Sequence, residues 1–174
     1  MDGSGSQWIP DRAYPAKHNA ILWHHDGSTQ RRERVELVNH KSQAESATAS
    51  LKIIVESVEA IVSETGRDRD PTVNLNHFLD QLTLPEVKAI YVISQAGRNP
   101  SWIEETSSIG PLYLNLTEIR PANEGKQGFM NFILTNTDGL RNYIDRYIET
   151  CSRLRLDPFE EIGILIQNEM AQEH

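Results

Sequence analysis

The strongest constraint on the fold is an apolar stripe within residues 51–62. Positions that recur at i, i+3, i+4 and i+7 share one face of a helix. The stripe therefore predicts an amphipathic helix that ends near Thr65-Gly66 and buries this face in a core. Its members are Leu51, Ile54, Val55, Val58, Ile61 and Val62.

Three other segments have helical signals. Apolar residues share one face in residues 74–82 and again from about Asp138 to Cys151. The third signal is the start of a C-terminal helix, where Asp157 can cap, Pro158 can occupy the first turn and Glu160 can complete a capping box.

Other segments resemble strands because they are short and rich in β-branched, aromatic or alternating apolar residues. Together these patterns predict an α/β or α+β fold, with a mixed, mainly antiparallel sheet packed against about four helices. Residues 129–134 are compatible with either helix or strand. The predicted strands are 87–94 and 112–119, a hairpin of 19–25 with 33–38, and two shorter segments at 102–107 and 153–156.

Length and composition limit the classes of protein to consider. The 174 residues suit one domain, predicted at 19–174, after a flexible N-terminal arm at 1–18. A net charge of −8 disfavours nucleic acid as a partner, and no apolar segment is long enough to cross a membrane. With a single cysteine, these features predict a soluble cytoplasmic protein.

The acidic residues are unevenly distributed. Residues 1–42 carry six basic and five acidic side chains, residues 43–136 carry seven and twelve, and residues 137–174 carry four and eight. Acidic helices of this kind could recognise a basic protein partner.

Two groups of residues suggest chemistry only weakly. His24, His25 and Asp26 are possible metal ligands, but adjacent strand residues point to opposite faces, so ordinary strand-end histidines are favoured and no metal site is predicted. Cys151 lies on the apolar side of a predicted helix, where a free cysteine is usually a small buried hydrophobic residue.

The loop around Gly125-Lys126-Gln127-Gly128 is the most informative polar segment. If a helix begins there, its free amides and Lys126 would form an anion site suited to a pyrophosphate. The alternative is a glycine-containing turn of a β-hairpin, with residues 129–134 as the next strand.

The predicted order of elements, together with this loop, resembles the GNAT acyltransferases, which use acetyl-CoA or another acyl-CoA. The resemblance covers most of residues 19–172 in topology, but only the loop in motif. It implies that Glu118, on a central strand, is the general base, and that the amides of Gly125, Lys126, Gln127 and Gly128 hold the CoA pyrophosphate.

Three hypotheses for function follow. The first is a GNAT-like acyltransferase, active or degenerate, with acetyl-CoA or another acyl-CoA as cofactor. The second is a non-enzymatic interaction or regulatory module whose acidic helices contact a basic protein partner. The third is a metal-binding protein that uses His24, His25 and Asp26.

Overall fold

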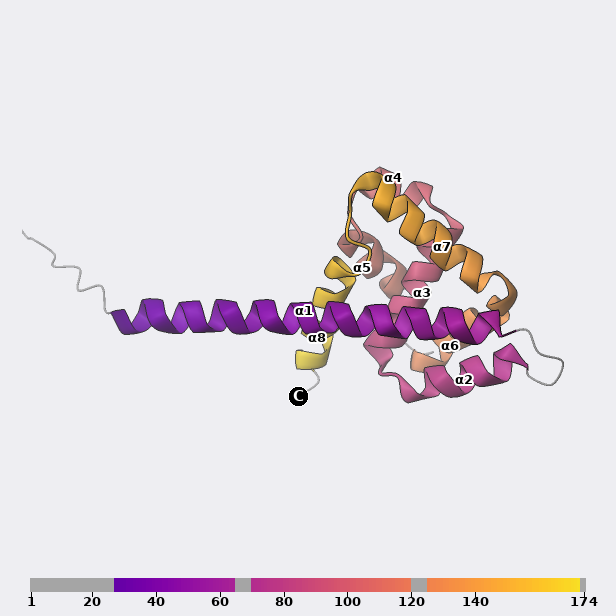
Figure 1. Cartoon of the computed structure of the whole chain (residues 1–174), viewed down its shortest axis with the longest axis horizontal. Coiled ribbons are helices and arrows are strands. Elements are labelled where there is room, and N and C mark those ends of the chain that lie inside the picture. Colours follow the sequence, from indigo (N-terminus) through magenta and orange to yellow (C-terminus); the bar gives the residue numbers. More distant parts are fainter. Residues whose placement is uncertain (1–26, 65–69, 120–124, 173–174) are drawn as a thin grey trace, which may run out of the picture.

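The computed structural model describes residues 27–64, 70–119 and 125–172, and over these ranges the chain forms helices and no strand. The longest helix, α1 (Gly27–Ser63), has 37 residues and spans about 55 Å at 1.5 Å per residue. Its C-terminal half lies across the other helices, and its N-terminal half extends beyond them (Figure 1). The others are α2 (Pro71–Gln81), α3 (Leu84–Arg98), α4 (Ser101–Thr106), α5 (Gly110–Ile119), α6 (Gly125–Thr135), α7 (Thr137–Leu154) and α8 (Glu160–Gln172).

Helix α3 is the centre of the bundle. Helices α1, α5, α6, α7 and α8 all pack against it. Its buried residues include Val87, Ile90, Tyr91 and Ile93, and two aromatic rings of α6, Phe129 and Phe132, meet the Tyr91 ring edge-on at 5.1 Å. A helix surrounded in this way must be apolar on nearly all of its faces.

Gly97 permits α3 and α7 to approach each other closely. A Cβ atom placed on Gly97 of α3 would lie 1.7 Å from the carbonyl oxygen of Tyr143 in α7. No side chain fits there, so the two backbones pass in direct contact and fix how α7 crosses the central helix.

Polar side chains define where several helices begin. The Glu86 carboxylate accepts hydrogen bonds from the Thr83 amide and hydroxyl at 2.7 Å each, which caps α3. Asp70 caps α2 by accepting from the Thr72 amide at 2.9 Å. The predicted cap before α8 is confirmed, because Asp157 accepts from the Phe159 amide at 2.8 Å and the Glu160 amide at 3.0 Å.

The predicted mixed α/β or α+β fold is wrong, and α3 shows the main reason. Residues 87–94 form the middle of α3 rather than a buried strand. A short, continuous apolar run fits either a buried strand or a helix surrounded by others. The signal that separates them precedes the run, because Thr83, Pro85 and Glu86 form a helix start.

The other predicted strands that fall on described residues are wrong as well. In α5, Leu112, Tyr113 and Leu116 are buried at helical spacing, and Leu114, which should share a face with its alternating neighbours in a strand, is 46% exposed. Residues 33–38 belong to α1 and 102–107 largely to α4. Residues 153–156 comprise the end of α7 and the turn after it, where Arg155 has a φ of 59°.

The helices predicted from amphipathic patterns are confirmed. Residues 51–62 lie in α1, residues 74–81 in α2 and residues 138–151 in α7, and residues 129–134, which fitted either structure, lie in α6. The predicted strand 19–25 and the predicted arm 1–18 lie outside the described residues.

Candidate functional site

The residues predicted to form an acyl-CoA site lie on two helices. Glu118 is exposed near the end of α5, and Gly125 to Gly128 form the first turn of α6. Helix α5 packs against α3, α4 and α8, whereas α6 packs against α2, α3 and α7. Glu118 is on no strand, so the resemblance to the GNAT family is wrong. The acyltransferase function inferred from it is withdrawn, because the sheet that would place the base beside the loop is not formed by the described residues.

The polar groups of this segment have structural roles. The Lys126 amine donates a hydrogen bond to the Asp80 carbonyl oxygen at 2.6 Å and lies 4.0 Å from the Asp80 carboxylate, which caps the C-terminal end of α2. The Gln127 amide donates to Asn131 at 2.9 Å within α6. Gly125 has a φ of 50°, a left-handed conformation that suits glycine at the start of the helix.

The other candidate groups can be placed only in part. His24, His25 and Asp26 lie outside the described residues, and the part of the chain that the structure describes contains no group of three potential metal ligands. Cys151 is fully buried in α7, as predicted, and burial raises the pKa of its thiol to about 11. A thiol of this kind is a poor nucleophile at neutral pH.

A groove lies between α1 and α8 on the described surface. It is open to solvent and has a volume of about 770 Å³. We call it the α1/α8 groove. One wall is formed by Lys41, Ala44, Glu45, Thr48, Ala49 and Lys52 of α1, and the other by Asp157, Pro158, Phe159, Glu160 and Ile164 at the start of α8.

The two walls are held together by a close helix crossing. A Cβ atom on Gly163 would lie 2.7 Å from the Thr48 hydroxyl oxygen and 2.9 Å from the Thr48 amide nitrogen, so α8 passes over α1 in near contact here. Because this crossing lets the helices diverge on both sides, a second, smaller groove of about 260 Å³ lies along α1, lined among others by Ser46, Leu51 and Met170.

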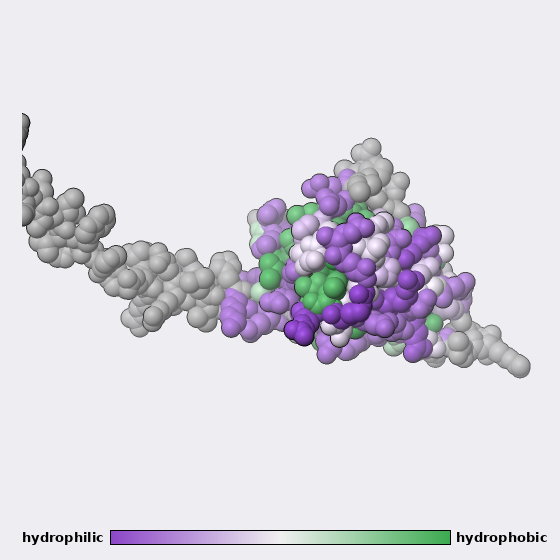
Figure 2. Space-filling view, turned by 90° about the horizontal axis from the view of Figure 1, so that it is seen from above, coloured by the Kyte–Doolittle hydropathy of each residue, from purple (hydrophilic) through white to green (hydrophobic). Residues whose placement is uncertain are grey.

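The α1/α8 groove combines apolar and charged surface. On the α8 wall, the Ile164 side chain is 39% exposed and lies beside Pro158 and Phe159. The α1 wall is shallow where Ala44 and Ala49 contribute small side chains. Figure 2 shows an apolar patch enclosed by mostly hydrophilic residues on the face that it presents. Exposed apolar surface with a polar border is typical of sites that bind other molecules.

Three acidic residues and two lysines line the groove. Lys41 lies 4.0 Å from Glu45, and Lys52 lies 3.9 Å from Glu56 one turn further along α1, so both cations are balanced within the helix. Asp157 and Glu160 are exposed on the opposite wall. They lie at the N-terminal end of α8.

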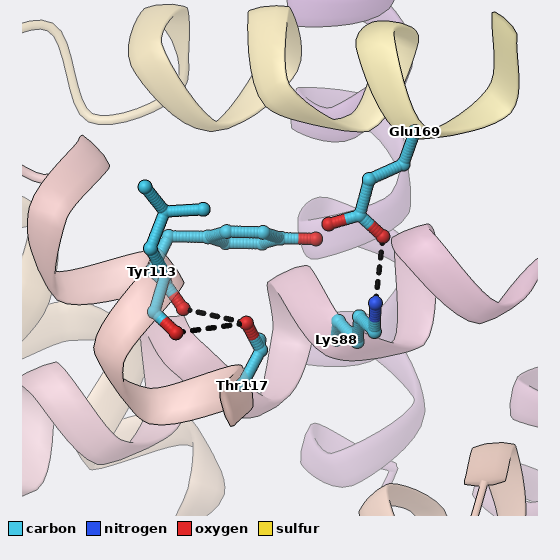
Figure 3. Close-up of polar contacts among 5 residues, drawn as sticks. Lys88, Tyr113, Thr117 and Glu169 are labelled. Atoms are coloured by element: carbon cyan, nitrogen blue, oxygen red, sulfur yellow. Dashed lines mark hydrogen bonds and ion pairs between the residues drawn. The ribbon is translucent and has the colours of Figure 1, made fainter. Parts of the chain in front are cut away.

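A second polar cluster lies in the interior, between α3, α5 and α8. Lys88 of α3 donates a hydrogen bond to Glu169 of α8 at 2.7 Å, and the Tyr113 side chain of α5 points toward this carboxylate (Figure 3). The Tyr113 hydroxyl is buried, and it faces the Glu169 carboxylate without forming a hydrogen bond of ordinary geometry. Burial, followed by the negative charge of Glu169, raises the pKa of this hydroxyl well above its ordinary value.

Sequence reasoning did not identify the α1/α8 groove. Its walls are separated by about a hundred residues of chain, and no motif joins them. Two local signals were present: the start of α8 at Asp157-Pro158, and Gly163 on the apolar face of α8, a small residue that permits a close crossing.

The described residues form a helical bundle with an exposed groove between α1 and α8. No known family model, curated protein sequence or solved structure matches the chain. No helix formed by the described residues has the length and apolar character needed to span a membrane. Function must therefore be argued from the groove itself.

Proposed function

We propose that this protein is a non-enzymatic interaction module that binds a basic amphipathic helix of a protein partner in the α1/α8 groove. The observation that carries the proposal is the composition of the groove, in which Ile164 and Phe159 offer apolar contact and Asp157 and Glu160 border it with negative charge. An amphipathic helix that lies in a groove anchors its apolar residues at i, i+3, i+4 and i+7.

The charge of the whole molecule supports a basic occupant. The chain has a net charge of −8, and its excess of acidic residues lies between residues 43 and 174. A field of this sign raises the association rate of a cationic segment and disfavours an acidic one. Because the proposed partner is a protein and Cys151 is a buried, unpaired thiol, we place the module in the reducing environment of the cytoplasm.

Binding of designed helical peptides tests the proposal. Two fluorescent peptides with the same leucine positions are compared, one with lysine and one with glutamate on the polar face, and anisotropy is measured at about 50 mM and 300 mM salt. We expect saturable binding of the lysine peptide, weakened at high salt, and at least tenfold weaker binding of the glutamate peptide.

Variants then locate the site. Ile164→Asp should weaken binding of the lysine peptide about tenfold, because it places a charge on the apolar wall. Val73→Asp is the matched control, since Val73 is an exposed apolar residue of α2 at 63% exposure and lies outside the groove. The proposal fails if neither peptide binds, if both bind equally, or if the two variants have the same effect.

A further inference from the structure

A second surface of α1 faces away from the bundle. Its residues are spaced 4, 3, 4, 3 and 4 apart, the spacing at which residues form the contact line of a coiled coil, and all six are exposed. Ile53, at 63%, is among the most exposed large apolar side chains of the described residues. We call this surface the outer face of α1. It comprises Ser42, Ser46, Ala49, Ile53, Glu56 and Ala60.

The outer face lies between the two grooves of α1. Ala49 lines the α1/α8 groove, and Ser46 lines the smaller groove on the other side of the crossing. The buried stripe of Leu51, Val55 and Val58 lies on the opposite side of the helix. The bundle and the outer face are thus on opposite sides of α1, and another helix can reach this face without displacing the bundle.

The N-terminal half of α1 gives a second reason to expect an intermolecular contact. It extends beyond the other helices of the bundle (Figure 1). Helices of this length gain most of their stability from packing against other elements rather than from their own sequence. A second α1 lying antiparallel along the outer face would run beside this extended half.

The charged residues beside the outer face would meet opposite charges if a second α1 ran antiparallel to the first. Glu45 and Lys52 flank the outer face on the same side of α1, two turns apart. In an antiparallel pair, Glu45 faces the partner's Lys52, and this contact occurs twice. A parallel, in-register pair would instead place like charges together, which is unfavourable.

From these observations we infer that two copies of the chain pair through the outer faces of α1 in an antiparallel, two-fold symmetric arrangement. In this register Ala49 lies opposite the partner's Ser46, and Ile53 lies opposite the partner's Ser42. Small residues at these positions allow the helices to approach closely, with the ion pairs at the edge of the contact.

The first test is the oligomeric state of the full chain, measured by sedimentation equilibrium from about 10 to 500 µM, since a contact of this size is at the weak end of specific interfaces. We expect a reversible equilibrium between monomer and dimer within this range of protein concentration. Ile53→Asp should raise the dimer dissociation constant about tenfold or more, because it buries a charge in the contact. Val73→Asp, an equally exposed apolar residue on α2, should leave the constant unchanged.

Charge reversal tests the orientation. Glu45→Lys and Lys52→Glu should each weaken the dimer about fivefold at low salt, because each places like charges together at two symmetric positions. The double variant restores opposite charges across the antiparallel contact and should recover most of the affinity. Circular dichroism of each variant checks that helicity is retained.

Three results would overturn the inference. The first is a monomer at every concentration tested. The second is a dimer that Ile53→Asp leaves intact, which would place the contact on another surface. The third is a double variant no tighter than either single variant, which would exclude the antiparallel register. The peptide-binding proposal is tested separately by Ile164→Asp, because Ile164 lies on the α8 wall of the groove and outside the outer face of α1, whereas Glu45 and Lys52 border both surfaces.

Discussion

Two buried tyrosines show how strongly the role of a single polar atom depends on its partner. The Tyr147 hydroxyl donates a hydrogen bond to the Pro158 carbonyl oxygen and thereby ties α7 to the chain before α8. The Tyr113 hydroxyl, equally buried, faces the Glu169 carboxylate (Figure 3) but forms no hydrogen bond of ordinary geometry. An unpaired buried hydroxyl costs free energy, whereas a paired one contributes about 1 kcal/mol net.

The same substitution at the two positions should therefore have opposite effects. We expect Tyr147→Phe to lower the free energy of unfolding by about 1 kcal/mol, because the Pro158 carbonyl loses its donor. Tyr113→Phe should leave stability unchanged or raise it by up to about 1 kcal/mol, because it removes an unpaired group without leaving a cavity. Urea denaturation of both variants is the measurement. A clear loss of stability in Tyr113→Phe would show that its hydroxyl is hydrogen-bonded in solution.

At the scale of elements, the accuracy of the sequence predictions depended on how each helix is surrounded. Helices α1 and α7 each expose one face, so their apolar residues recur with helical spacing and were identified. Helix α3 is enclosed by five others, and its sequence lost the periodicity that distinguishes helix from strand. In α5, the exposed Leu114 completed a false alternation with the buried Leu112 and Leu116. Of the polar helix starts, Asp157 before α8 was identified, whereas Thr83 before α3 was not.

The candidate site was harder to predict than the helices. Its walls come from distant segments, and their proximity depends on the crossing at Gly163, which is a property of packing. The loop at Gly125 to Gly128 attracted attention because glycines beside a lysine are typical of anion sites. In the structure, Lys126 contacts the end of α2 instead. Local sequence cannot show which helix end a long side chain will reach.

A hydrogen-bonded contact between α8 and the start of α5 predicts how the stability of the fold depends on pH. Glu161 of α8 accepts hydrogen bonds from the Ser108 hydroxyl at 2.7 Å and from the Ile109 and Gly110 amides at 2.9 and 2.6 Å, so it caps α5. Burial raises the pKa of this carboxyl, but the three hydrogen bonds outweigh burial and hold the pKa below its ordinary value of 4.5. A lowered pKa in the folded state stabilises the fold above the unfolded pKa, and this contribution is lost as the pH falls through the folded value.

We therefore expect Glu161→Gln to lower the free energy of unfolding by about 1–2 kcal/mol at pH 7. The difference from the parent protein should persist down to about pH 4.5 and shrink below it, as the parent carboxyl becomes protonated. Chemical denaturation at a series of pH values measures it. Glu160→Gln, an exposed neighbour, is the control and should show little effect. A difference that is independent of pH would mean that the charge of Glu161 does not contribute to the cap.

At the scale of the whole molecule, Cys151 can report on the opening of the bundle. Its side chain is fully buried in α7, and its pKa is raised to about 11, so both access and ionisation limit its reaction. If the bundle opens cooperatively, the thiol becomes reactive only in the small fraction of molecules that are unfolded. We expect its modification by a disulfide reagent at pH 8 to be about a thousandfold or more slower in native buffer than in denaturant.

A matched variant separates the effect of burial on thiol reactivity from the effect of a position in α7. Ser152 is the next residue of α7 and is exposed, so Ser152→Cys in a Cys151→Ala background should react in native buffer at nearly its rate in denaturant. Addition of moderate urea should accelerate Cys151 in proportion to the unfolded population, because each molecule reacts only after opening. Equal native rates at the two positions, or a Cys151 rate that urea does not change, would show that α7 opens locally and that the bundle does not unfold as one unit.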